Sequence, residues 1–508
     1  MIEMDTRAGK SAKSFVWSTV FVIVTSGMPF IIRTLLIRFW GYEYAGLGSL
    51  FNSVLNVLNI TELGVGEALV YSLYAPMAKG ETKEANALLL LYKRIYTVIG
   101  IIVAILGCAI IPFLSYLIEG EVPKDINIVI IYVITLANTV GSYLVFSYCH
   151  SVFQTNQSLF LTYKYCSFNF FVMYILQILI ILRLHNYYLY AVLLPVFTIF
   201  SHCINYLLVK KYYPQYYPEG RIERDFMPDF IKRISGMMIR KFRNQLRGAI
   251  DNIVISAVLG LVVLAKFQNY YLIMSVPLMI LGTVRSSVLQ SLGNSVATET
   301  VESNYSVERL YVFITQWFGC MFGTVLLCVF HPMMILWLRD ENATFPFYVE
   351  ILFVVYFYLT AMTYITDLMR NSTGIWWQGK WIPIIETLLN LTLDIIGVHL
   401  FGVFGVLLAT IISLVLVNIP CETWCIYKYY FHKSPMKDLL KYVFDCACNL
   451  AIGATVYYIC LKVSGNLLVE LVLKAVLSFM LVNILLFLVN IKNKNMWEIL
   501  HIFRKIIR

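Results

Sequence analysis

The sequence predicts an all-α integral membrane protein with about fourteen transmembrane helices. Apolar stretches of about twenty residues recur along the 508-residue chain, and a helix needs that length to cross roughly 30 Å of hydrocarbon. Hydrophobic residues make up 60% of the chain and charged residues 13%, against about 45–50% and 25% in soluble domains. Lys and Arg gather in alternate gaps between the stretches, which is typical of cytoplasmic loops.

The apolar stretches can be placed in order along the chain. The predicted helices cover residues 14–38, 44–74, 88–118, 126–152, 160–183, 187–210, 246–265, 267–296, 308–331, 346–371, 380–400, 402–428, 440–462 and 466–490. The first is too long for a cleavable signal and is expected to stay as a span. With the N-terminus inside, about thirty of the 39 Lys and Arg face the cytoplasm. We therefore expect a multi-pass protein of the bacterial cytoplasmic membrane with both termini inside.

One long gap divides the chain. Residues 211–245 alternate apolar and basic side chains at helical spacing, which favours an amphipathic linker on the inner leaflet. The predicted organisation is an N-lobe at 1–210 with helices 1–6 and a C-lobe at 246–431 with helices 7–12. Residues 432–508 hold helices 13 and 14 and a basic tail. Two six-span lobes of equal parity indicate parallel repeats, related by a pseudo-two-fold axis along the membrane normal.

Several polar side chains lie inside the predicted spans, where an ionised group costs roughly 2.5–3.5 kcal/mol. Those that we expect to line a substrate pathway are Arg33, Asn52, Asn56, Asn59, Glu62, Arg247, Asp251, Asn252 and Arg285. The residues from Asn52 to Glu62 form one stripe on span two, which either lines a pathway or hydrogen-bonds into a neighbouring helix. Arg247 and Asp251 are four apart and can pair locally. Arginines that open into a cavity suit a phosphate.

Two further carboxylates lie in the eleventh predicted span. Glu386 and Asp394 are eight residues apart and share one helical face. They can pair structurally, or they can carry a proton or a cation. Together with Glu62 they are the candidates for ion coupling, with H⁺ or Na⁺ as the ion.

Other classes of protein are disfavoured. Seven scattered histidines and eleven cysteines form no metal-ligand pattern, and no phosphate-cradling loop or nucleophile elbow occurs. We therefore expect no enzyme, no metal and no cofactor. The net charge of +10 lies in juxtamembrane loops, where it contacts anionic phospholipids rather than nucleic acid.

Two blocks of the sequence resemble bacterial Wzx-type oligosaccharide flippases. The first block contains RTLLIRFWGYEYAGL at residues 33–47 and ELGVGEA at 62–68. The second contains DNIVIS at 251–256, QNYYLI at 268–273 and SLGNS at 291–295. The wider superfamily includes the multidrug and toxin extruders, which usually have fewer spans, and the lipid II flippases, whose usual span number this chain shares.

The resemblance implies two six-helix lobes around a central cavity, with two additional C-terminal helices. It also implies a substrate, a polyprenyl-pyrophosphate-linked oligosaccharide moved from the inner to the outer leaflet for capsule or O-antigen synthesis, alongside glycosyltransferases and a polymerase. Arg33, Arg247 and Arg285 would neutralise the phosphates. The alternatives are a cation-coupled multidrug antiporter, a lipid II flippase, a membrane polymerase and a structural scaffold. An acidic cavity would favour the antiporter, and an arginine-lined cavity would favour the flippase.

Overall fold

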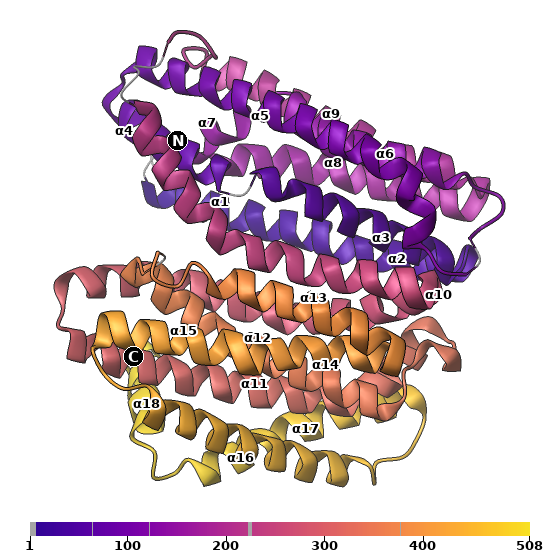
Figure 1. The fold of residues 1–508 in the computed structure, drawn as a ribbon, viewed down its shortest axis with the longest axis vertical. Helices are drawn as coiled ribbons and strands as arrows, with labels where there is room; N and C mark the ends of the chain where they lie inside the picture. Colours follow the sequence, from indigo (N-terminus) through magenta and orange to yellow (C-terminus); the bar gives the residue numbers. More distant parts are fainter. Residues whose placement is uncertain (1–6, 63, 121, 222–225, 376, 508) are drawn as a thin grey trace. The chain divides into compact units, whose positions relative to one another are not determined.

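The computed structural model describes residues 7–62, 64–120, 122–221, 226–375 and 377–507, and within these ranges it contains helices and connecting segments but no strand. The chain forms two compact units, Met1–Ala265 and Lys266–Arg508. We call them unit 1 and unit 2. Figure 1 shows their helices, coloured along the sequence.

Unit 1 contains nine helices and the first part of a tenth within the described ranges, with short 3₁₀ and π turns. They are α1 (Arg7–Val22), η2 (Ile23–Gly27), α2 (Met28–Phe39), α3 (Tyr42–Leu58), η3 (Asn59–Glu62), α4 (Val65–Lys79), α5 (Thr82–Ile110), η4 (Ile111–Leu117), α6 (Ile128–Leu144), α7 (Cys149–Thr155), α8 (Leu159–Leu179), η5 (Ile180–Leu184), α9 (Tyr187–Tyr212) and α10 (Phe226–Thr298), which continues into unit 2.

Unit 2 contains the rest of α10 and the remaining helices. They are α11 (Val301–Leu338), η6 (Glu341–Ala343), α12 (Phe347–Thr373), α13 (Ile382–Phe401), α14 (Val403–Ser413), η7 (Leu414–Asn418), α15 (Ile419–Ile426), η8 (Tyr427–Phe431), α16 (Met436–Cys460), α17 (Leu467–Val489) and α18 (Lys494–Ile507).

The helices match the predicted fold class. In the described part of the chain, eleven helices are long and apolar enough to cross a membrane, and α6 with α7 passes the same test as a pair bent by 54°, which is either a broken span or a re-entrant loop. The apolar helix Gln245–Thr298 contains two of the predicted spans, and α3 with α4 covers another. Every predicted span thus has a helical counterpart, and the chain is an all-α, multi-pass membrane protein.

The prediction of one continuous helix over 44–74 is wrong in detail. α3 ends at Leu58, a 3₁₀ turn follows, and α4 begins at Val65. Gly64 has φ 81°, in the left-handed region that only glycine enters easily. The polar stripe on span two is therefore interrupted, and Glu62 lies at the break.

The predicted boundary between spans seven and eight, at residue 266, is also displaced. α10 consists of two helices that meet at Gly260, where φ is 85° and ψ is 175°. A Cβ atom at Gly260 would lie 2.7 Å from the carbonyl oxygen of Glu119, and one at Gly46 would lie 2.1 Å from that of Leu261. Both positions require glycine because backbone approaches backbone there.

The first part of α10 therefore packs within unit 1. The predicted linker, 211–245, is helical from Phe226 onward, but most of its side chains lie outside the described residues, including all of those at 231–244. Its amphipathic face and the predicted lobe boundaries stay predictions.

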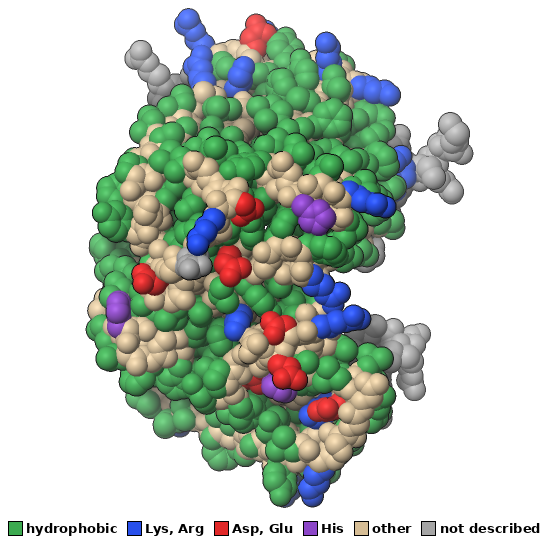
Figure 2. Space-filling model, turned by 90° about the vertical axis from the view of Figure 1, so that its right-hand side faces the viewer, with side chains coloured by type: hydrophobic (Ala, Val, Ile, Leu, Met, Phe, Trp, Pro, Cys, Tyr) green, Lys and Arg blue, Asp and Glu red, His purple; other side chains and the backbone are tan. Residues whose placement is uncertain are grey.

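The surface agrees with a membrane environment. Hydrophobic side chains cover much of the face drawn in Figure 2, and charged side chains lie between them singly or in small groups. On α17, Val469, Val472 and Leu473 are each about half exposed. In water this would leave large apolar areas uncovered, whereas acyl chains cover them in a bilayer.

Candidate functional site

The break in span two places the Glu62 carboxylate between two tyrosines from neighbouring helices. Tyr96 of α5 donates to Oε1 of Glu62 at 2.7 Å, and Tyr143 of α6 donates to Oε2 at 2.9 Å. The Tyr143 hydroxyl also lies 2.9 Å from Oδ1 of Asn59. Tyr92 stacks on Tyr96 with ring centroids 4.4 Å apart. We call Glu62, Tyr96 and Tyr143 the open cage, because Glu62 also faces a cavity.

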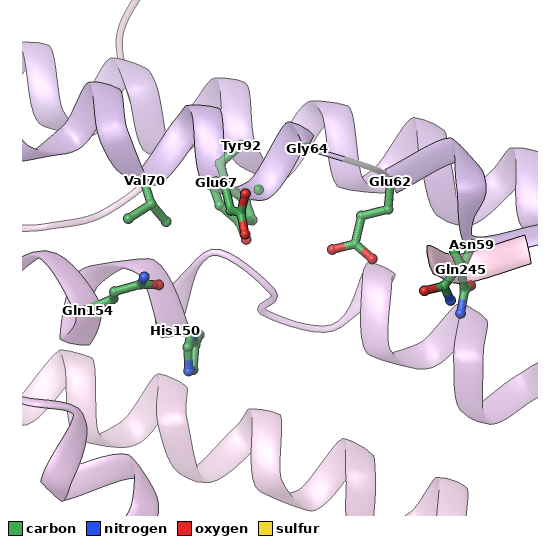
Figure 3. Close-up of a pocket in the computed structure, with 10 residues that line it drawn as sticks. Asn59, Glu62, Gly64, Glu67, Val70, Tyr92, His150, Gln154 and Gln245 are labelled. Atoms are coloured by element: carbon green, nitrogen blue, oxygen red, sulfur yellow. The ribbon is translucent and has the colours of Figure 1, made fainter. Parts of the chain in front are cut away.

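The cavity lies within unit 1 and has a volume of about 510 Å³. Figure 3 shows Glu62 and Glu67 on one side of this space and His150 and Gln154, from α7, on the other. Its lining residues are Asn59, Glu62, Gly64, Gly66, Glu67, Val70, Tyr92, His150, Gln154 and Gln245. The cavity is large enough for a saccharide unit or a drug-sized molecule.

The lining is polar and acidic. Two carboxylates, one imidazole and three side-chain amides line it, and its described lining contains no Lys or Arg. Such groups can accept from and donate to sugar hydroxyls. Two carboxylates also attract a cation and repel a phosphate.

The asparagines of the predicted stripe have different environments. Asn59 lines the cavity, whereas Asn52 and Asn56 are exposed on α3. The Gln245 amide lies 3.4 Å from Oδ1 of Asn56 and also lines the cavity. Asn56 is therefore not a lining residue, but it contacts Gln245, which is one.

The two arginines predicted in unit 1 do not line this cavity. Nη1 of Arg33 donates to Oγ of Ser49 at 3.3 Å, and Nη2 donates to the carbonyl of Ala265 at 3.0 Å. Arg33 thereby joins α2 to α3 and to α10. Arg247 is half-buried on α10.

The neighbours of Arg247 on α10 are buried. Asp251 is 3% exposed and Asn252 is 8% exposed. Asn252 donates to Oγ of Ser53 at 2.9 Å, so this amide bonds α10 to α3 inside unit 1.

Arg285 belongs to unit 2. Its guanidinium lies 5.4 Å from the centroid of the Tyr364 ring on α12, within the range of a cation–π contact.

Glu386 and Asp394 lie in a buried polar stripe on α13, with exposures of 1% and 0%. Asn418, in the π turn η7, donates to Glu386 at 2.7 Å. Asn390, between the two carboxylates on the same face, donates to Thr410 of α14 at 3.2 Å. The predicted shared face is present, and its neighbours are polar groups of α14 and η7.

Of the ten described residues that line the cavity, the sequence predicted only Asn59 and Glu62 as site residues. His150 and Gln154 lie on α7, which is bent by 54° from α6. The predicted span over 126–152 contains His150 as part of a continuous apolar helix and ends before Gln154. Tyr96 and Tyr143 gave no signal because isolated tyrosines are common in transmembrane helices.

No protein-family model matches the sequence, and no curated protein matches it. The lipid II flippase MurJ in an inward closed conformation is similar in structure, with a TM-score of 0.68, 15% identity, and coverage of 94% of this chain and 99% of that chain.

An inward-facing MATE-family multidrug resistance transporter of the MOP superfamily is also similar, with a TM-score of 0.63, 14% identity, and coverage of 82% of this chain and 98% of that chain. A mutant of the Vibrio cholerae MATE transporter VcmN has a TM-score of 0.55 at 14% identity, over 84% of this chain and 98% of that chain. The chain therefore has the fold of the MOP-superfamily transporters and flippases.

Proposed function

We propose that this chain is a flippase that moves polyprenyl-pyrophosphate-linked oligosaccharides from the inner to the outer leaflet of the bacterial cytoplasmic membrane, for surface polysaccharide synthesis. The main support for the proposal is the share of this chain that is similar in structure to a lipid II flippase. The similarity to the lipid II flippase covers 94% of this chain, whereas the similarities to the two MATE transporters cover 82% and 84%. The chain thus shares more of its architecture with a carrier of a lipid-linked substrate.

The cavity supports a saccharide cargo. A sugar hydroxyl costs several kcal/mol to desolvate in hydrocarbon if it finds no partner. The Glu62 carboxylate, held by two tyrosines, keeps lone pairs for sugar hydroxyls, and the amides of Asn59, Gln154 and Gln245 both donate and accept. The polyprenyl tail need not leave the bilayer.

The pyrophosphate needs a different place, because the Glu62 carboxylate in this cavity would repel it. The residues that we propose to contact it are Arg33 and Arg247 of unit 1 and, separately, Arg285 of unit 2, none of which lines the described acidic cavity. Outward movement of this anion is favoured by an inside-negative potential, by about 2.3 kcal/mol per charge per 100 mV.

The breaks at Gly64 and Gly260 are natural points for the bending that alternating access requires, because both glycines already have positive φ. Glu386 and Asp394 are the proposed sites for H⁺ or Na⁺ coupling, and Glu62 is the third candidate. Glycosyltransferases would supply the lipid-linked substrate, and a polymerase would consume it.

One observation favours a second function. An acidic, arginine-free lining in the described cavity is what a cation-coupled multidrug antiporter would use, since its cargo is cationic. A lipid II flippase is the other alternative, and the structural likeness to MurJ supports it.

A flipping assay in proteoliposomes tests the proposal. The probe is a fluorescent polyprenyl-pyrophosphate-linked oligosaccharide in the outer leaflet, and a membrane-impermeant reductant bleaches whatever remains outside. We expect protein-dependent protection of the probe, and loss of that protection in Arg33→Ala and Arg285→Ala. Arg221→Ala, at an exposed position, is the matched control. Efflux of a cationic dye without any flipping would overturn the proposal in favour of the antiporter.

A further inference from the structure

Within the described part of unit 2, three tryptophan rings besides Trp497 of α18 are exposed. Trp377 and Trp381, in the loop between α12 and α13, are 65% and 61% exposed, and Trp424 of α15 is 48% exposed. Membrane proteins place such rings at the boundary between hydrocarbon and lipid headgroups, because an indole is apolar but carries one N–H donor. This part of unit 2 is therefore expected to meet the headgroup layer.

A lysine ammonium accompanies these rings. Nζ of Lys380 lies 3.6 Å from the centroid of Trp377 and 5.5 Å from that of Trp381, and Nζ of Lys428 lies 4.4 Å from that of Trp424. The negative face of an indole ring attracts a cation at these distances. Both ammonium groups thus lie against indole rings.

Neither ammonium is neutralised by a carboxylate of the described chain. Among the described residues, Lys380 and Lys428 form no ion pair, whereas Lys433 lies 2.8 Å from Glu302 and also lies over the Tyr305 ring. Lys433 has its anion within the protein. The ammonium groups of Lys380 and Lys428 are therefore available to bind an anion that is not part of the protein.

A buried ion pair holds the two tryptophan segments together. Nη1 of Arg370, on α12, contacts both carboxylate oxygens of Glu422 on α15, at 2.6 and 2.7 Å. Nε of Arg370 donates to the carbonyl of Ile375 at 3.2 Å, and a Cβ atom at Gly379 would lie 2.9 Å from the guanidinium. The loop is thus packed on Arg370, and Arg370 is bonded to the helix that carries Trp424.

We propose that Trp377, Lys380, Trp381, Trp424 and Lys428 bind the headgroups of anionic phospholipids, and we call them the Trp–Lys surface. The lysines contact the phosphate, and the indole rings lie at the acyl boundary. The charge selects a lipid with net negative charge, since a choline headgroup brings its own cation to the phosphate. The proposal does not depend on the transported cargo.

Native mass spectrometry of the full chain in detergent tests this. The probes are phosphatidylglycerol and phosphatidylcholine with the same acyl chains. A lysine near an anionic lipid surface contributes enough to change affinity by about fivefold. We expect Lys380→Gln and Lys428→Gln each to weaken phosphatidylglycerol binding by about that factor, and the double variant to weaken it by the product of the two.

The matched control is Lys433→Gln, which removes a lysine already paired with Glu302 and should change the affinity by less than about twofold. Thermal unfolding of each variant verifies that it is folded. Unchanged phosphatidylglycerol binding in the folded double variant would overturn the proposal. So would equal binding of phosphatidylcholine, or an equal loss in Lys433→Gln.

Discussion

Units 1 and 2 each contain a glutamate held by two tyrosine hydroxyls, and the two sites differ in access. In the open cage, Glu62 accepts from Tyr96 and Tyr143 and faces a cavity of about 510 Å³. In unit 2, Glu308 of α11 accepts from Tyr442 of α16 at 3.0 Å and lies 3.4 Å from the Tyr427 hydroxyl of η8.

We call the second site the closed cage. Glu308 is 3% exposed, and the adjoining space of about 20 Å³ holds no more than about one water. The same donor set can thus prepare a carboxylate for a ligand or fix three helices to one another. Access decides between the two roles.

The largest expected effect is a loss of stability when the glutamate of the closed cage is replaced. Glu308→Ala leaves buried tyrosine hydroxyls without their acceptor, which costs about 2 kcal/mol or more in the free energy of unfolding. Denaturant titration in mixed micelles measures this. Glu302→Ala, on the same helix and in an exposed ion pair, is the control and should cost less than about 1 kcal/mol. Equal costs for the two variants would mean that the closed cage does not stabilise unit 2.

The second effect is a loss of transport when the glutamate of the open cage is replaced. Glu62→Gln keeps one acceptor oxygen but removes the charge, so transport should fall by about tenfold or more, equal to about 1.4 kcal/mol. Unfolding should change by less than about 1 kcal/mol, because water from the cavity can replace lost hydrogen bonds. The flipping assay measures transport, and Glu81→Gln, at an exposed position, is the control. Full activity would leave Glu62 with only a packing role.

Sequence reasoning found the helices because apolar length is a local property. It expected the fourteen spans, and it found the shared face of Glu386 and Asp394, because each depends on residues within one helix. It placed the start of the ninth span at residue 308, whereas α11 begins at Val301. Glu308 was therefore left out of the intramembrane charges, although it lies two turns inside the helix.

The cages could not be predicted in this way. Tyr96 is 34 residues from Glu62 and Tyr143 is 81 residues from it, so no local pattern connects them. The break at Gly64 follows from one residue with positive φ, and its position decides which side chains reach the cavity. The arginines were expected to share one cavity, but Arg33 bonds to Ser49 and Ala265 instead of lining the acidic one in unit 1.

A third, smaller effect tests the geometry of the open cage. A Cβ atom at Gly66 would lie 2.4 Å from the Tyr96 hydroxyl oxygen, so Gly66→Ala should push this side chain off its rotamer at a cost of about 0.5–1.5 kcal/mol. Transport should fall by about twofold to tenfold. At Gly48 the nearest atom is 4.0 Å away, and Gly48→Ala is the matched control. If both variants transport alike, the position of Tyr96 is unimportant.

The smallest effect asks whether the two hydrogen bonds of the closed cage are equal. Tyr442→Phe removes a 3.0 Å bond to Glu308 and should cost about 1 kcal/mol. Tyr427→Phe removes a longer and therefore weaker hydrogen bond of 3.4 Å, and should cost less than about 0.5 kcal/mol. The same denaturant titration gives the loss in free energy of unfolding for each variant. Transport per folded molecule should stay unchanged in both. A loss of transport in a fully folded Tyr442→Phe would mean that the closed cage also takes part in the transport cycle, because a purely structural hydrogen bond affects activity only through the folded fraction.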